Sequence, residues 1–238
     1  KQQFEVENWQ KRVFHYIESK QNVFLSVPTS GGKTIVVTGS ILATNYKVLI
    51  VLPTEALAFQ VASSLDGMMS KKTEHRICAL WTENYRYNIE RYHILISTPS
   101  IIEKNLENIY TQFDYVIYDE VHCLNYEEIG GSIERMIHYF SKSSFFALSA
   151  TVHNVKEICT WWQNVIKAPI QIEIYKKRFI NLERHTVING NQVYLHPLSI
   201  IQFEDLKSQE NALDTLAFCP RDIAECWMAI EKIFKNNP

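Results

Sequence analysis

The sequence predicts an α/β fold in which a mostly parallel β-sheet lies between helices. Short apolar runs rich in β-branched residues recur between residues 23 and 148. Runs of this length are typical of strands that are buried on both faces of a parallel sheet. A polar or amphipathic stretch of helical length follows each run, and such an alternation indicates βαβ units.

The predicted strands are, in chain order, residues 23–27, 47–52, 93–97, 115–118 and 145–148. The predicted helices are residues 33–44, 55–69, 99–108, 127–141 and 154–166. Folds of this kind bind ligands at the carboxyl ends of their strands. The residues that directly follow each apolar run are therefore the first candidates for a functional site.

The pattern changes after about residue 168. Ala168-Pro169 ends the last helix, and Ile170–Tyr175 alternates as a half-exposed strand does. Asn189-Gly190 predicts the turn of a β-hairpin. We expect three parts: a ligand-binding domain over residues 1–168, a connector with a β-hairpin over 169–212, and an accessory helix or the beginning of a second domain over 213–238.

The composition is that of a globular chain. It has 238 residues, 46% of them hydrophobic and 21% charged, with a net charge of -2. These values exclude a disordered or collagen-like protein and a globally basic nucleic-acid coat. No run approaches the roughly 18 apolar residues of a membrane-spanning helix, so no membrane partner is expected.

Five widely spaced cysteines without a Cys-x-x-Cys pair favour free thiols over a disulfide framework or a zinc site. The N-terminus, Lys1-Gln2-Gln3-Phe4, carries neither a secretory signal nor an initiator Met. We therefore expect a piece of a longer intracellular protein, located in the cytoplasm rather than in the nucleus.

A phosphate-binding loop is predicted after the first strand, at Val27-Pro28-Thr29-Ser30-Gly31-Gly32-Lys33-Thr34. Glycines let backbone N–H groups converge on a phosphate chain, and the helix N-terminus that follows offsets its negative charge. Lys33 is expected to bind the β- and γ-phosphates, and the Thr34 hydroxyl to bind Mg²⁺. The strict loop pattern is broken, because Val27 stands where that pattern has its first glycine.

Two further groups of polar residues follow later strands. Asp119-Glu120 comes directly after the run 115–118, and adjacent carboxylates there are costly unless a cation or a substrate uses them. Asp119 is suited to hold Mg²⁺, and Glu120 to position and deprotonate an attacking water. Ser149-Ala150-Thr151 follows the run 145–148 and offers two hydroxyls. The combination of the three groups, in this order, is far more specific than any one of them.

These motifs resemble those of superfamily 2 DExH-box helicases, in the first RecA-like domain. Pro28–Thr34 is similar to motif I, Asp119–His122 to motif II and Ser149–Thr151 to motif III. Pro53–Leu57 is similar to motif Ia and Ser97–Pro99 to motif Ib. Within the superfamily the chain resembles the superkiller-type branch and its large antiviral relatives, on Gly130–Arg135 and Phe145–Thr151. The similarity covers about residues 4–168 well and the rest loosely.

The resemblance implies a RecA-like P-loop NTPase domain that binds ATP and Mg²⁺ and belongs to an ATP-dependent RNA helicase. It implies that Lys33, Asp119 and Glu120 are catalytic, and that Thr34 and Asp119 bind the metal. ATP-binding residues by resemblance are Gln10, Pro28, Thr29, Ser30, Gly31, Gly32, Lys33 and Thr34. Gln10 would contact the adenine, although a glutamine on a helix surface explains it almost as well.

The resemblance also assigns roles outside the ATP site. His122, Ser149 and Thr151 would couple hydrolysis to movement of the strand. Pro53, Thr54, Ala56 and Thr98 would contact the backbone of single-stranded nucleic acid, RNA in preference to DNA. The arginine-rich motif VI of a second RecA-like domain is absent. We expect that domain to be a partner from the same polypeptide, and the fragment alone to be inactive or very weak.

Some residues depart from the family pattern. Glu55 stands in motif Ia where the family usually has Lys or Arg, and it would repel phosphate. Thr82-Glu83-Asn84 replaces a glycine pair. Two alternatives therefore stay open: a DNA-directed motor of the same superfamily, and a nucleotide-regulated RNA-binding scaffold or sensor without turnover.

Overall fold

A computed structural model describes residues 7–28, 32–69, 77–109, 113–150, 152, 154–175, 181–200 and 216–236. The chain divides into two compact units, Lys1–Lys176 and Lys177–Pro238. Each unit is described by itself.

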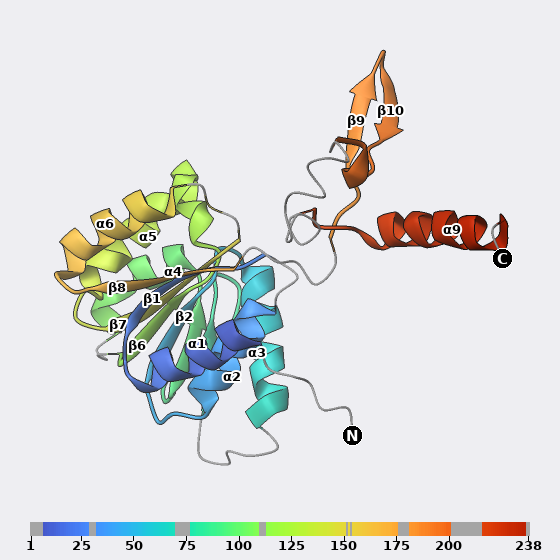
Figure 1. Cartoon of the computed structure of the whole chain (residues 1–238). Coiled ribbons are helices and arrows are strands. Elements are labelled where there is room, and N and C mark those ends of the chain that lie inside the picture. Colours follow the sequence, from blue (N-terminus) through green and yellow to red (C-terminus); the bar gives the residue numbers. More distant parts are fainter. Residues whose placement is uncertain are drawn as a thin grey trace. The chain divides into compact units, whose positions relative to one another are not determined.

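The first unit is built on one sheet of eight strands in the order β4-β3-β5-β2-β6-β7-β1-β8 (Figure 1). All neighbouring strands are parallel except β3 and β4. The strands are β1 (Asn22–Ser26), β2 (Val48–Val51), β3 (Cys78–Trp81), β4 (Arg86–Tyr87), β5 (Ile94–Ser97), β6 (Tyr115–Tyr118), β7 (Ser144–Ser149) and β8 (Ile170–Ile174). This architecture confirms the predicted α/β fold with a mostly parallel sheet.

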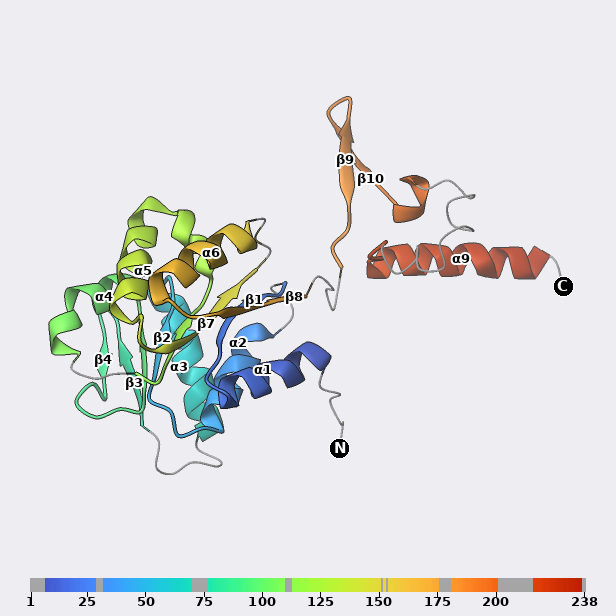
Figure 2. The same ribbon diagram turned by 60° about the vertical axis from the view of Figure 1, so that its left-hand side comes forward.

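Helices cover both faces of the sheet (Figures 1 and 2). On one face lie α1 (Asn8–Glu18), α2 (Lys33–Leu42) and α3 (Glu55–Met69). On the other lie α4 (Pro99–Lys104), α5 (Glu127–Tyr139) and α6 (Val155–Ile166). The short 3₁₀ segments η2 (Leu106–Asn108) and η3 (Val121–Asn125) follow α4 and β6.

Two hydrophobic cores result from the alternation of side chains along each strand. In β1, Val23 and Leu25 pack with α1–α3, whereas Phe24 packs with α4–α6. Burial on both faces explains why the central strands are continuous apolar runs. On the second face Trp162 of α6 stacks on Phe145 of β7, with ring centroids 4.2 Å apart.

The strand β8 extends the main sheet at its edge. The half-exposed strand expected over residues 170–175 is present as β8, which pairs in parallel with β1 from Asn22↔Ile170 to Ser26↔Ile174. As an edge strand it is polar on alternate residues, so it lacks the apolar run that marks the buried strands. The expected helix 99–108 is also divided, into α4 and η2.

The second unit contains a hairpin of β9 (His185–Ile188) and β10 (Asn191–Tyr194), then η4 (Pro197–Ile200) and α9 (Pro220–Asn236). The predicted Asn189-Gly190 turn is present, and both residues have positive φ angles, 51° and 78°. Tyr194 donates a hydrogen bond to Asp222, which joins the hairpin to α9. Whether 213–238 is an accessory helix or begins a second domain stays a prediction.

Within the described ranges no helix is both long enough and apolar enough to cross a bilayer.

Candidate active site

The predicted phosphate loop joins β1 to α2 at the carboxyl edge of the sheet. Val27 donates a backbone hydrogen bond of 3.1 Å to Ser149, so the loop leaves the sheet beside the end of β7. Gly32 precedes α2 with φ 66°, a left-handed conformation that glycine adopts without strain. Lys33 is the first residue of α2, and Pro28 is buried. Thr29, Ser30 and Gly31 lie outside the described residues.

The end of β6 lies against the start of α2. Thr34 Oγ1 donates a 2.9 Å hydrogen bond to Asp119 Oδ2, and the Glu120 N–H donates one of 2.9 Å to Asp119 Oδ1. The Asp119 N–H continues the sheet by donating to the Val51 carbonyl at 3.0 Å. The structure thus brings the metal-binding residues predicted from two distant motifs into direct contact.

Glu120 has an unusual backbone conformation, φ 53° and ψ 49°. A non-glycine residue in this left-handed region is strained, and such residues cluster at functional sites. The conformation places Glu120 Oε1 3.5 Å from Lys33 Nζ, and Glu120 Oε2 3.2 Å from His122 Nδ1. The side chain of Lys33 is only 4% exposed, so this positive charge is held inside the site.

Four buried polar atoms of this region make no hydrogen bond with a described residue, although two of them, Glu120 Oε2 and His122 Nδ1, lie 3.2 Å apart. They are Lys33 Nζ, Glu120 Oε2, His122 Nδ1 and Ser149 Oγ. A buried polar atom without a hydrogen bond costs about 1–3 kcal/mol, so native proteins keep few of them. Their concentration around Lys33 and Glu120 indicates a site whose hydrogen bonds are completed by a polar ligand.

Burial raises the pKa of Asp119, and the nearby charge of Glu120 adds to that effect. The hydrogen bond from Thr34 and the charge of Lys33 oppose the increase but do not cancel it. A carboxylate that is costly to ionise is stabilised when a cation binds it. The electrostatics of Asp119 therefore fit a metal ligand better than a structural carboxylate.

A cavity of about 190 Å³ adjoins the carboxylates between α2, α3 and the end of β6. Asp119, Glu120 and Thr34 line one side of it, and Gln60 and Ser64 of α3 line another. Its walls are polar next to the site, so water can reach Glu120 from this side.

The residues predicted to contact nucleic acid follow β2 and β5 at the same edge. Registers Val51↔Ser97 and Val51↔Tyr118 show that β2, β5 and β6 end level with one another. Thr54 and Ala56 are exposed at the start of α3, and Pro53 is half-buried. Thr98 is the N-cap residue of α4 but is only 8% exposed. The four residues therefore share an edge with the ATP-site candidates, although Thr98 offers little surface.

The remaining predicted residues differ in what surrounds them. Gln10 lies in the first turn of α1, and its Oε1 accepts a 2.9 Å hydrogen bond from the Glu7 N–H. Glu7 and Gln10 thus form a capping box, and their three-residue spacing could have predicted the start of α1. Ser149 ends β7 and is buried, while Thr151 lies outside the described residues.

Residues 7–158 match the DEAD/DEAH box helicase family, and the chain belongs to that family. It is similar to a human protein named "Probable ATP-dependent RNA helicase DDX60-like", with 27% identity over 66% of this chain and 10% of the relative. It is 28% identical to the antiviral helicase SKI2 of Saccharomyces cerevisiae, over 81% of this chain and 16% of the relative. These relatives confirm the predicted similarity to the superkiller-type branch.

The ATP-dependent DNA helicase Hel308 of Thermoplasma volcanium is 25% identical, over 85% of this chain and 34% of the relative. Among solved structures, a hypothetical ATP-dependent RNA helicase from Sulfolobus tokodaii has a TM-score of 0.62 at 19% identity, over 77% of this chain and 59% of that chain. This likeness supports the helicase fold. The chain spans between a tenth and about a third of the length of the three relatives.

Proposed function

We propose that this chain is the ATP-binding core domain of an ATP-dependent RNA helicase, which moves along RNA or remodels it. The observation that carries the proposal is the group of buried polar atoms without hydrogen-bond partners around Lys33 and Glu120. A nucleoside triphosphate supplies the partner that Lys33 lacks, because its phosphate oxygens accept hydrogen bonds from the Lys33 ammonium group.

The residues of the site fit Mg²⁺ and ATP. Thr34 Oγ1 and the Asp119 carboxylate supply the oxygen ligands that Mg²⁺ prefers. When bound, the metal neutralises charge on the phosphates and so assists phosphoryl transfer. The backbone at Gly32 and the buried Lys33 hold the phosphate chain at the start of α2.

Glu120 is the proposed base. Its strained backbone and its position between Lys33 and His122 aim the carboxylate into the site, where it orients and deprotonates the attacking water. His122 and Ser149 couple this reaction to nucleic-acid movement. Hydrolysis also needs cations on the far side of the phosphates, which we assign to a second RecA-like domain of the parent polypeptide. Arginine fingers of this type raise rates by about 10³–10⁵.

Titration of a fluorescent ADP with Mg²⁺ tests the binding half of the proposal. Lys33→Ala should weaken binding at least tenfold, which corresponds to about 1.4 kcal/mol. Lys142→Ala is a matched control, since Lys142 is exposed and precedes β7 at the opposite edge of the sheet. Equal affinities of the two variants would refute the site.

Turnover is tested in the parent polypeptide. Glu120→Gln should keep nucleotide binding and abolish ATP hydrolysis. Undiminished function of that variant would favour a nucleotide-regulated scaffold or sensor.

A DNA-directed motor is the second candidate, and the similarity to Hel308, named a DNA helicase, favours it. Comparing ATPase stimulation of the parent by single-stranded RNA and by DNA separates the two. Stimulation by duplex DNA alone would refute the RNA assignment.

A further inference from the structure

The sheet order indicates on which side of β1 the base of a nucleotide lies. This step depends on the function proposed above. Asp119 and Glu120 follow β6, which is separated from β1 by β7, and β8 is the neighbour on the other side of β1. The γ-phosphate must lie near Asp119 and Glu120, because these residues serve hydrolysis. The nucleoside, at the opposite end of the phosphate chain, is therefore directed toward β8 and α1.

An aromatic residue is found at that place. Tyr175 follows β8 directly, and its N–H donates a 2.8 Å hydrogen bond to the Ser26 carbonyl. Ser26 is the last residue of β1, one residue before Val27. The backbone of Tyr175 is thus fixed beside the first residues of the phosphate loop. Tyr175 is half-buried, so part of the residue is open to contact.

The ring of Tyr175 is held by the N-terminal turn of α1. Its centroid lies 5.9 Å from that of the buried Trp9, with an interplanar angle of 36°. Glu7 Oε2 accepts a 2.5 Å hydrogen bond from Trp9 Nε1. Burial raises the pKa of Tyr175, and the nearby Glu7 carboxylate adds to this effect. Glu7 in turn caps α1 together with Gln10, so one acidic residue connects Tyr175, Trp9 and the candidate adenine contact.

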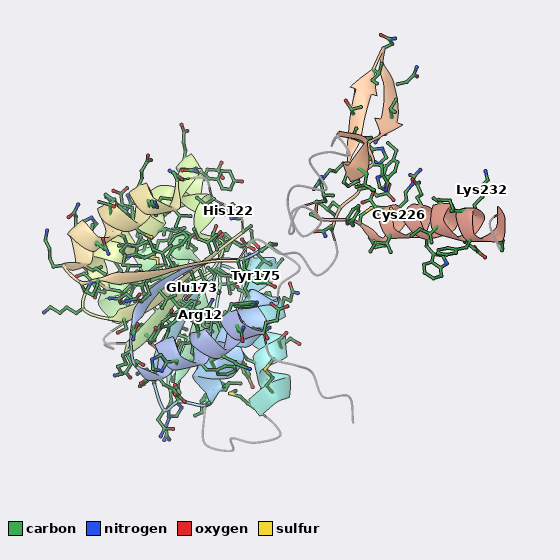
Figure 3. The ribbon with its side chains drawn as sticks, viewed as in Figure 1. Arg12, His122, Glu173, Tyr175, Cys226 and Lys232 are labelled. Atoms are coloured by element: carbon green, nitrogen blue, oxygen red, sulfur yellow. The ribbon has the colours of Figure 1, made fainter. Side chains whose placement is uncertain are left out.

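A second contact fastens β8 to α1. Arg12 donates two hydrogen bonds to the Glu173 carboxylate, Nε to Oε1 at 2.8 Å and Nη2 to Oε2 at 2.9 Å (Figure 3). Tyr16 donates a third to Oε1 at 2.6 Å. Because side chains alternate along a strand, Glu173 and Tyr175 point to the same face, toward α1. A bidentate pair fixes orientation as well as distance, so Tyr175 is positioned before any ligand binds.

We propose that Tyr175 contacts the base of the bound nucleotide and forms, with the N-terminal turn of α1, the base-side wall of the site. An aromatic ring stacks on any base, so Tyr175 contributes affinity, whereas the carboxamide of Gln10 distinguishes the edges of bases. Stacking on an aromatic side chain changes affinity by about 5- to 150-fold per base.

Calorimetric titration of the 238-residue chain with ADP and with inorganic pyrophosphate, each with Mg²⁺, tests this. Pyrophosphate has no base and isolates the phosphate loop. Tyr175→Ala should weaken the affinity for ADP at least fivefold and change the affinity for pyrophosphate by less than twofold. Tyr175→Phe, which keeps the ring, should bind ADP much more tightly than the alanine variant. Tyr139→Ala is the control, because Tyr139 of α5 is exposed, and it should bind ADP and pyrophosphate as tightly as the unmodified chain does.

The outcomes separate this proposal from the function itself. Unchanged ADP affinity of Tyr175→Ala, or an equal loss for ADP and pyrophosphate, would overturn the role of Tyr175. If Lys33→Ala kept its affinity for both ADP and pyrophosphate, the proposed ATP site itself would be overturned. Should Tyr175→Ala fail to fold, Tyr175→Leu preserves apolar volume without an aromatic face and is expected to give the same selective loss of ADP.

Discussion

Thr34 Oγ1 donates a 2.9 Å hydrogen bond to Asp119 Oδ2 across 85 residues of sequence. This bond joins the helix of the phosphate loop to the strand that carries the acidic motif. Both oxygens are also the proposed ligands of Mg²⁺. The two residues should therefore respond to the metal together.

The first prediction concerns the Thr34 hydroxyl. Thr34→Ala should remove most of the gain in ADP affinity that Mg²⁺ gives over EDTA, because one metal ligand is lost. Thr34→Ser keeps the hydroxyl and should preserve the gain. The measurement is ADP titration of both variants with and without Mg²⁺. Equal metal dependence of the alanine and serine variants would mean that Thr34 is not a ligand.

The second prediction concerns the effect of the buried Asp119 carboxylate on the free energy of unfolding. Its pKa is raised by burial, so the folded state binds a proton more tightly than the unfolded state does. This contribution to the free energy of unfolding is favourable at low pH and is lost as pH rises above the ordinary aspartate pKa. At neutral pH, Asp119→Asn should thus stabilise the nucleotide-free chain by about 0.5–2 kcal/mol.

Urea denaturation at pH 7 without nucleotide measures that change. The same variant should lose the Mg²⁺-dependent part of ADP binding. The Asp119 carboxylate would then be a residue that lowers stability but is needed for binding. Destabilisation of Asp119→Asn by more than about 1 kcal/mol would contradict the argument, since the hydrogen bond from Thr34 would then outweigh the burial of charge.

Much of this fold is predictable from the sequence, because strands buried on both faces must be continuous apolar runs. Two elements are not: β4 has two residues, and β3 is a short run, Cys78–Trp81, that follows a polar stretch. Helix α1 is absent from the helices expected above, although Trp9, Val13 and Ile17 form an apolar stripe at helical spacing. The strand β8 alternates because it lies at an edge, so periodicity alone does not assign it to the main sheet.

The site shows a similar division. The residue types of the loop and of Asp119-Glu120 predict their chemistry. The 3.5 Å approach of Glu120 to Lys33 and the place of Tyr175 depend on the order of strands in the sheet. No local pattern encodes them, because each contact joins segments that are distant in sequence.

The third prediction concerns two adjacent glycines of α5. A Cβ on Gly130 would lie 2.2 Å from the Leu124 carbonyl oxygen, which belongs to the backbone of η3. Gly130→Ala should therefore destabilise the chain by about 1–3 kcal/mol and displace the segment that carries His122. A Cβ on Gly131 would meet only the end of the Arg135 side chain, at 3.3 Å.

Gly131→Ala is thus the matched control. Alanine favours a helix over glycine by about 1 kcal/mol, so this variant should be neutral or stabilised. Urea denaturation of the two variants gives the comparison. Equal stability of the two variants would show that η3 can move away from α5 at no cost.

The fourth prediction is the acid limit of stability. Hydrogen bonds from Arg135 and Ser132 lower the pKa of Glu103, and one from Lys20 lowers that of Asp114. Burial raises the pKa of Glu173, but hydrogen bonds from Arg12 and Tyr16 outweigh it and lower the pKa overall. Each group stabilises the fold above its ordinary pKa of about 4, and this contribution is lost as pH falls through the lower folded pKa.

Unfolding by urea between pH 3 and pH 7 should therefore show a free energy that rises with pH across the acid range. The side chain in Glu173→Gln cannot titrate, so the free energy of unfolding of this variant should depend less steeply on pH than that of the unmodified chain. Glu134→Gln, on an exposed residue of α5, is a control with the same change of charge. Identical slopes for all three chains would show that the Arg12–Glu173 contact does not form in solution.

The fifth prediction concerns the nucleic-acid edge. Glu55 begins α3 beside the proposed backbone contact Thr54, and its Oε2 accepts a 3.1 Å hydrogen bond from Asn84 Nδ2. A carboxylate at this place repels phosphates. Glu55→Lys should thus tighten single-stranded RNA binding and increase the slope of log affinity against log salt by about one unit, as one added phosphate contact does.

Glu107→Lys makes the same change of charge in η2, after α4 has run away from the carboxyl edge. It should leave the salt slope unaltered, because only a charge close to the bound strand releases counterions. The measurement is fluorescence anisotropy of a labelled RNA at several salt concentrations. Equal gains in RNA affinity from Glu55→Lys and Glu107→Lys would reflect net charge alone. That result would contradict the proposed contacts of Thr54 and Ala56 with RNA. A gain confined to Glu55→Lys would indicate that the strand crosses the start of α3.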